Sequence, residues 1–170
     1  IGLAAGTETG IRGTLIYLAI YLAMNIGTFA CILCMRRGDH MVEGIDDLAG
    51  LGKTPPMLAL GLSIFMFSMA GIPPLAGFFG KFYIFLAAVE AGLYGLAVIG
   101  VLASVVAAFY YLRIVQMIYF EEPDETLDKP VSRELGMVII GTGLMITFFF
   151  VYPGPLLDAA SAAAKSLFAG

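Results

Sequence analysis

Long apolar runs separated by short charged segments make up most of the chain. The first run, residues 14–35, has no charged residue in 22 positions and ends at Arg36. A helix of that length is about 33 Å long, enough to cross the ~30 Å hydrocarbon layer of a bilayer. The pattern predicts an all-α, polytopic transmembrane helix bundle that forms a single membrane domain over residues 1–170. Its predicted spans, which follow a polar loop at 1–13, are about 14–35, 57–89, 93–120 and 135–152.

The second of these spans is predicted to be discontinuous. A continuous helix over residues 57–89 would be about 50 Å long, too long for the hydrocarbon layer. Two glycines and two prolines fall in its middle, namely Gly71, Pro73, Pro74 and Gly77. Proline removes hydrogen bonds from a continuous helix, so the pattern predicts a broken helix, interrupted at 71–77. Unwound backbone at membrane depth needs protein or water around it, and we expect residues 72–76 to be non-helical and buried in protein.

Composition agrees with a membrane environment. Hydrophobic residues make up 60% of the chain and charged residues 13%, and a charged share of about 25% is typical of soluble domains. The net charge of −4 is small, and no basic cluster indicates binding to nucleic acid. The sequence starts at Ile1 without an initiator methionine or a signal peptide, so we expect a piece of a longer protein.

Basic residues are concentrated in two loops between the predicted spans. The loops at 36–56 and 112–134 contain Arg36, Arg37, Lys53, Arg113, Lys129 and Arg133. The opposite side of the membrane would carry only Arg12 and Lys165. By the positive-inside rule, the two charged loops are predicted to be cytoplasmic, with both ends of the sequence on the outer side.

Lys81 is the only ionisable residue well inside a predicted span. It lies about 13 Å from Glu90 along a helix, close to the membrane midplane. A charged lysine at that depth costs about 3 kcal/mol on insertion scales, and desolvation disfavours its charged form. A lysine balanced between two protonation states can accept and release a proton, so Lys81 is the candidate proton-transfer residue. The alternatives are a lysine that reaches the interface, or one paired statically with an acid on another helix.

Other residues carry weaker signals. The helix break at Gly71, Pro73, Pro74 and Gly77 either builds an ion site from freed backbone groups, as in transporters, or shapes packing alone. Asn25 and Thr28, in the middle of the first span, either line a water path or hydrogen-bond across helices. Two cysteines, Cys31 and Cys34, are expected to pack as small apolar residues. No metal-binding or cofactor-binding motif is present.

The stretch from Ser68 to Phe82, SMAGIPPLAGFFGKF, resembles the signature of the antiporter-like membrane subunits of respiratory complex I. Relatives of that family include the Mrp-type sodium/proton antiporters and membrane-bound hydrogenases. Segments 16–27 and 104–113 also fit the family. In the largest antiporter-like subunit an acid typically follows the lysine directly. In the middle-sized antiporter-like subunit a glutamate typically replaces the lysine itself. Lys81 followed by Phe82 therefore resembles the remaining antiporter-like subunit.

The resemblance implies two inverted repeats, each with one broken helix, in a subunit of about fourteen helices. This chain would hold the last four helices, among them the broken helix of the second repeat. Lys81 would match the terminal lysine that faces the proton exit. The implied function is proton translocation within NADH:quinone oxidoreductase, coupled to quinone reduction. This chain would hold no redox centre, with NADH, FMN, iron–sulfur clusters and quinone on other subunits.

The implied partners are the other membrane subunits of the complex and lipid, in a bacterial inner membrane or the mitochondrial inner membrane. Two alternative functions stay open. One is a subunit of an Mrp-type sodium/proton antiporter, which can also carry a lysine at this position. The other is a structural membrane module in which Lys81 forms a static ion pair.

Overall fold

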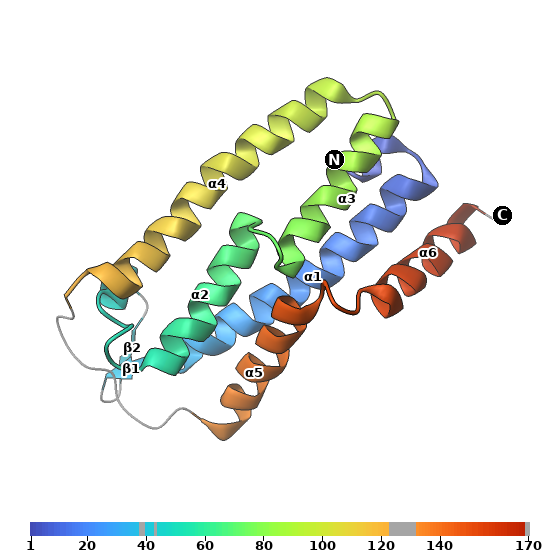
Figure 1. Cartoon of the computed structure of the whole chain (residues 1–170). Helices are drawn as coiled ribbons and strands as arrows, with labels where there is room; N and C mark the ends of the chain where they lie inside the picture. Colours follow the sequence, from blue (N-terminus) through green and yellow to red (C-terminus); the bar gives the residue numbers. More distant parts are fainter. Residues whose placement is uncertain (38–39, 43, 123–131, 169–170) are drawn as a thin grey trace.

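The computed structural model describes residues 1–37, 40–42, 44–122 and 132–168. Its helices are α1 Glu8–Leu33, α2 Pro56–Ala70, α3 Ala76–Glu90, α4 Tyr94–Phe120, α5 Arg133–Phe148 and α6 Gly154–Phe168. The smaller elements are the 3₁₀ turns η1 Leu3–Ala5 and η2 Asp46–Leu48, and the paired strands β1 Arg36–Arg37 and β2 His40–Met41. The six helices form an elongated bundle (Figure 1), and the predicted all-α fold class is confirmed.

Helix α1 lies at the centre of the bundle and packs against α2, α3, α5 and α6. It begins earlier than predicted, because Thr7 caps it: the Thr7 hydroxyl accepts a hydrogen bond from the Gly10 amide at 3.1 Å. Residues 8–13, predicted as part of a loop, are therefore helical. Their glycines serve close packing, since a Cβ at Gly13 would lie 3.0 Å from the Tyr83 carbonyl oxygen of α3.

The helical conformation is interrupted between α2 and α3. Helix α2 ends at Ala70, its C-cap Gly71 has a left-handed φ of 89°, and α3 begins at Ala76. The non-helical segment is therefore 71–75, shifted by one residue from the predicted 72–76. Figure 1 shows α3 continuing in the general direction of α2. The expectation of a buried break is wrong for this chain: residues 72–74 are exposed, because no other described element covers them.

The C-terminal region also differs from the prediction of one span at 135–152. Helix α5 ends at Phe148, and α6 begins at Gly154 after an irregular segment. Pro153 and Pro155 explain the interruption, because proline lacks a backbone N–H and restricts the residue before it. Helix α6 packs on α1 through Ala160 and other small residues. In Figure 1, α5 and α6 follow one another along α1, as α2 and α3 do.

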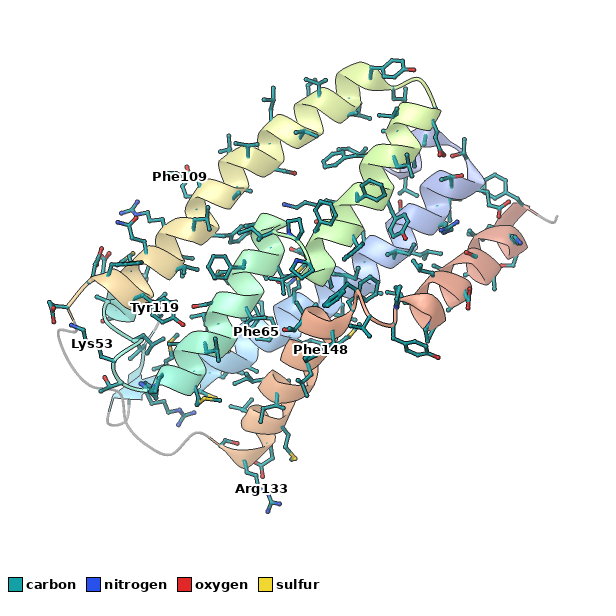
Figure 2. All side chains as sticks on the ribbon, in the orientation of Figure 1. Lys53, Phe65, Phe109, Tyr119, Arg133 and Phe148 are labelled. Atoms are coloured by element: carbon teal, nitrogen blue, oxygen red, sulfur yellow. The ribbon has the colours of Figure 1, made fainter. Side chains whose placement is uncertain are left out.

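The middle of helix α4 is little covered, because its buried residues lie toward its two ends. Its last turn is fixed by the loop before α2: the amides of Gly50 and Gly52 donate to the carbonyls of Met117 and Ile118 at 3.1 and 2.8 Å. These are helix-terminal carbonyls that lack partners within the helix. An exposed salt bridge between Lys53 and Glu122 lies at the same end, where Figure 2 labels Lys53 and Tyr119.

Two of the described helices, α1 and α4, are long and apolar enough to cross a membrane. The middle of α4 exposes large apolar side chains, including Val101, Leu102, Val105, Val106 and Phe109. Exposed apolar patches of this kind mark contact with lipid or with other protein. The surface of α4 therefore indicates that water does not surround this chain.

Candidate functional site

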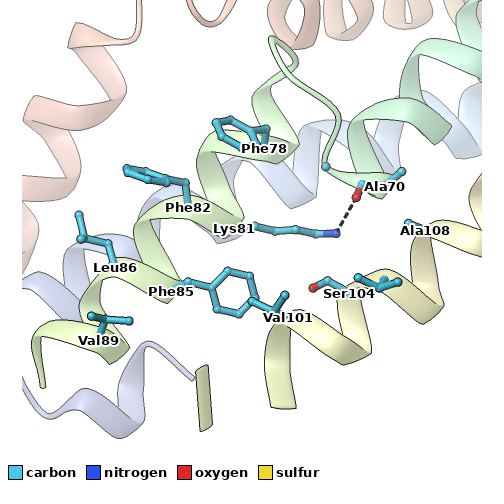
Figure 3. Close-up of a pocket in the computed structure, with 12 residues that line it drawn as sticks. Ala70, Phe78, Lys81, Phe82, Phe85, Leu86, Val89, Val101, Ser104 and Ala108 are labelled. Carbon is cyan, nitrogen blue, oxygen red and sulfur yellow. Dashed lines mark hydrogen bonds between the residues drawn. The ribbon is translucent and has the colours of Figure 1, made fainter. Parts of the chain in front are cut away.

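Lys81 projects from α3 toward the C-terminal end of α2. Its Nζ donates hydrogen bonds to the carbonyl oxygens of Met69 and Ala70 at 2.9 and 3.2 Å, and Figure 3 shows the second bond. Carbonyls in the last turn of a helix lack helical partners, and the helix dipole gives this end a partial negative charge. The C-terminal end of α2 therefore forms a binding site for a cationic amine.

Gly71 makes this arrangement possible. Its left-handed conformation ends α2, and its amide donates to the carbonyls of Phe67 and Ser68, a frequent form of helix C-cap. A Cβ at this position would lie 3.2 Å from Cδ and 3.4 Å from Nζ of Lys81. Glycine thus provides both the backbone conformation and the room that the lysine side chain occupies.

Ser68 connects the two half-helices from the α2 side. It is fully buried, and its hydroxyl oxygen accepts a hydrogen bond from the Gly77 amide of α3 at 3.0 Å. The same hydroxyl donates to the sulfur of Met24 on α1 at 3.0 Å. A Cβ at Gly77 would overlap the Ser68 carbonyl oxygen. The signal for this role in the sequence was a serine in the last turn of a helix that ends at a glycine.

Lys81 lies between two cavities and lines both of them, as does Ser104 of α4. The first, of about 470 Å³, is an apolar space between α3 and α4. Figure 3 shows Phe78, Phe82 and Phe85 along its α3 side. Lys81 is partly buried at the edge of this space, rather than enclosed by this chain.

The second cavity, of about 210 Å³, is more polar. Besides Lys81 and Ser104, it is lined by three tyrosines that the sequence analysis did not single out, Tyr17 and Tyr21 of α1 and Tyr111 of α4. The rings of Tyr17 and Tyr21 are stacked, with centroids 5.7 Å apart. Their spacing of four residues on one helix was the available signal, because it places both on one face.

Asn25 and Thr28 are not brought to Lys81. The Asn25 amide donates to the Tyr21 carbonyl at 2.7 Å, and the Thr28 hydroxyl donates to the Met24 carbonyl at 2.8 Å. Both bonds lie within α1, a local pattern common for short polar side chains. Neither residue lines either cavity next to Lys81, so these contacts do not connect α1 to another helix.

The remaining candidates divide between the break and the apolar core. Pro73 and Pro74 are exposed within the break, whereas Gly77 lines the smaller cavity. Both cysteines are free thiols. Across the described ranges, no group of three or more histidine, cysteine or acidic residues is placed to hold a metal ion, and Lys81 forms no salt bridge with any of those residues.

A family model described as NADH:quinone oxidoreductase/Mrp antiporter, transmembrane, matches residues 1–107. The chain is 59% identical over 167 residues to NADH-quinone oxidoreductase subunit N of Rhodospirillum rubrum, covering 98% of this chain and 34% of the relative. The subunit of the same name from Parvibaculum lavamentivorans is 60% identical over 167 residues, covering 98% of this chain and 35% of the relative. The chain thus spans about a third of the length of the curated relatives that it matches.

Comparison with solved structures also finds similarity to a chain of respiratory complex I. A chain of respiratory complex I from Thermus thermophilus with bound aureothin has a TM-score of 0.79 and 29% identity, covering 94% of this chain and 36% of that chain. For the same complex with bound NADH, the TM-score is 0.77 and the identity 30%, covering 96% of this chain and 35% of that chain. The family match extends over more than half of the chain and includes the broken helix and Lys81, so this chain belongs to the NADH:quinone oxidoreductase/Mrp antiporter family of transmembrane proteins.

Proposed function

We propose that this chain is part of a proton-translocating membrane subunit of NADH:quinone oxidoreductase, and that Lys81 accepts and releases the transferred proton. The observation that carries this proposal is the position of the Lys81 amine. It sits on the end of α2, at the break, between a polar and an apolar cavity. The high identity to proteins named subunit N supports the choice of complex.

The contacts of Lys81 suit a group that changes its protonation state in place. An ammonium has three N–H donors and a neutral amine has two N–H donors and a lone pair. The carbonyls of Met69 and Ala70 take two N–H groups, which both forms possess. The third position is an N–H in the charged form and an acceptor in the neutral form. Lys81 can therefore gain or lose one proton while both contacts persist.

Water in the smaller cavity is the natural carrier of that proton. A volume of about 210 Å³ has room for several water molecules at about 30 Å³ each. The cavity also offers hydroxyl groups, from Ser104 and the three tyrosines, as partners for water. Quinone reduction elsewhere in the complex would change charges near Lys81, and these would shift its balance between the two forms.

The proposal includes a membrane topology. Four spans, formed by α1, by α2 with α3, by α4 and by α5 with α6, would place the charged loops in the cytoplasm of a bacterial cell, with the protein in the inner membrane. NADH, FMN, iron–sulfur clusters and quinone would be held by other subunits. Lipid and the other membrane subunits would cover the exposed apolar surface of α4.

Substitution of Lys81 tests the proposal in the intact complex. We expect Lys81→Ala to lower the number of protons translocated per electron while complex content stays near the wild-type level, because a buried charge contributes little to stability. Lys81→Arg should not restore translocation, because a guanidinium does not release its proton at neutral pH. The measurement is proton uptake by inverted membrane vesicles during NADH oxidation, with complex content checked on native gels.

Lys165→Ala is the matched control, because Lys165 is an exposed lysine on α6; it should pump normally. A Lys81→Ala complex that assembles and pumps at the wild-type ratio would remove Lys81 from the proton path. The same assay with and without sodium addresses the antiporter alternative. Translocation by the wild type that requires sodium would favour the Mrp-type function over the proposed one.

A further inference from the structure

In the first turn of α3, a backbone amide donates its hydrogen bond to a side chain of another helix. A helix normally satisfies its N-terminal amides through the side chain of its own N-cap residue, which accepts from the second or third helical position. The N-cap of α3 is Leu75, which has no acceptor in its side chain, and no side-chain cap is formed there. The second residue of α3, Gly77, instead donates to Ser68 on the preceding helix.

Ser68 therefore caps α3 from the other side of the break. Ser68 belongs to α2, and its hydroxyl joins this helix to two others: it accepts a hydrogen bond from Gly77 of α3 and donates one to Met24 of α1. The residue is fully buried, and its hydroxyl is the acceptor that the structure provides for the Gly77 amide. The absence of a Cβ at Gly77 lets the Ser68 backbone approach the start of α3.

This cap lies beside the contacts of Lys81. Gly77 precedes Lys81 by four residues, about one helical turn, and the two carbonyls that hold the amine belong to Met69 and Ala70, directly after Ser68. The bond from Gly77 to Ser68 thus fixes the start of α3 against the same turn of α2 that receives the lysine. The same turn of α2 therefore holds both the start of α3 and the lysine amine.

We propose that Ser68 is a positioning residue for Lys81, because its hydroxyl joins the two half-helices and sets the distance from the lysine amine to the end of α2. This role rests on the proposed function of Lys81 in proton transfer. Ser68 itself does not take part in the transfer, since its hydroxyl is occupied by Gly77 and Met24.

The test compares Ser68→Ala with two controls in the intact complex. Ser63→Ala is the matched control, because Ser63 is also buried on α2 but donates only to the Ala59 carbonyl of its own helix, at 2.7 Å. Met24→Leu removes the sulfur acceptor and leaves the bond between Ser68 and Gly77 available. The readouts are amide hydrogen exchange of the segment 72–80, protons translocated per electron, and complex content.

We expect Ser68→Ala to exchange about five- to tenfold faster in segment 72–80, as the loss of one buried hydrogen bond implies. It should translocate fewer protons per electron than the wild type, with NADH-oxidising complex still present. Ser63→Ala should match the wild type in both readouts. Met24→Leu should keep the wild-type exchange rate of segment 72–80, because the bond from Gly77 to Ser68 remains. Ser68→Cys, which retains the shape but offers a weak acceptor, should exchange at an intermediate rate.

Wild-type exchange in Ser68→Ala, or faster exchange with an unchanged proton-to-electron ratio, would overturn the positioning role. If Ser68→Ala does not assemble, Ser68→Cys decides by the same two readouts, and wild-type behaviour of that variant would also overturn it. Failure of the underlying function is distinguishable. In that case Lys81→Ala pumps normally, while hydrogen exchange still reports whether Ser68 caps α3.

Discussion

At the scale of single residues, Gly71 meets two separate requirements. Its φ of 89° lies in the left-handed region, which other residues adopt at a cost of about 1–2 kcal/mol. Its missing side chain also leaves the space next to Cδ and Nζ of Lys81. The first requirement concerns the stability of the break and the second concerns the position of the amine. The two can be separated by experiment, because Gly92 is also left-handed but lies away from Lys81.

Gly71→Ala should impair both stability and function, whereas Gly92→Ala should impair stability alone. Gly92 has a φ of 74°, and a Cβ added there would have no atom within 4 Å, so both substitutions carry a similar backbone cost of about 1–2 kcal/mol. Only Gly71→Ala also displaces Lys81. The comparison requires proton-to-electron ratios and complex content for both variants; equal ratios would show that Lys81 tolerates the displacement.

The residues of the site differ in how far the sequence could predict them. Lys81, Pro73 and Pro74 stand out because a charge and two helix-breaking residues are rare within an apolar run. The roles of Ser68 and Tyr111 depend on how separate helices are placed beside one another. Hydrophobic periodicity gives no information on that placement, so the bond from Gly77 to Ser68 and the tyrosine-lined cavity required the structure.

At the scale of elements, the contact between α1 and α2 is set by one glycine and one aromatic ring. A Cβ at Gly27 would overlap the ring of Phe65, which is fully buried. Small residues at helix–helix contacts in membranes allow the backbones to approach closely. This contact holds α1 and α2 in the positions from which Met24 and Ser68 reach one another.

Gly27→Ala should destabilise the assembled complex by about 1–3 kcal/mol, the usual cost of overpacking a tight core. Gly141→Ala is the control, because Gly141 is a helical glycine of α5 with no atom within 4 Å of an added Cβ, and alanine there should be neutral or slightly stabilising. Complex content after graded heating on native gels measures the difference. Equal heat resistance of the two variants would contradict a tight contact between α1 and α2.

The helix pattern explains which element boundaries could be predicted. The ends of α4 and the break after α2 follow charges, glycines and prolines that are visible in the sequence. The start of α1 was missed because glycines there serve close packing instead of a loop. The end of α5 was predicted too late, because the apolar run continues to Tyr152, past the last residue of α5.

At the scale of the whole molecule, the two ends of the bundle can be distinguished by labelling. Turn η2 exposes Asp46 at the end with the charged loops, and Glu90 is exposed at the hairpin between α3 and α4. With Cys31 and Cys34 replaced by serine, an impermeant maleimide should label Glu90→Cys in intact cells and Asp46→Cys only in inverted vesicles. The reverse pattern would invert the proposed orientation; Asp124, in the other charged loop, lies outside the described residues.

The arrangement along α1 has a mechanical consequence. The two interrupted pairs, α2 with α3 and α5 with α6, both pack on α1, and their interruptions lie at the same height, since the ring of Phe79 contacts that of Phe149 with centroids 5.7 Å apart. An unbroken helix resists bending through its continuous ladder of backbone hydrogen bonds, and an interrupted one does not. Among the described elements, the continuous backbone ladders at the height of Lys81 therefore belong to α1 and α4, so these two helices form the rigid connection between the halves of the bundle.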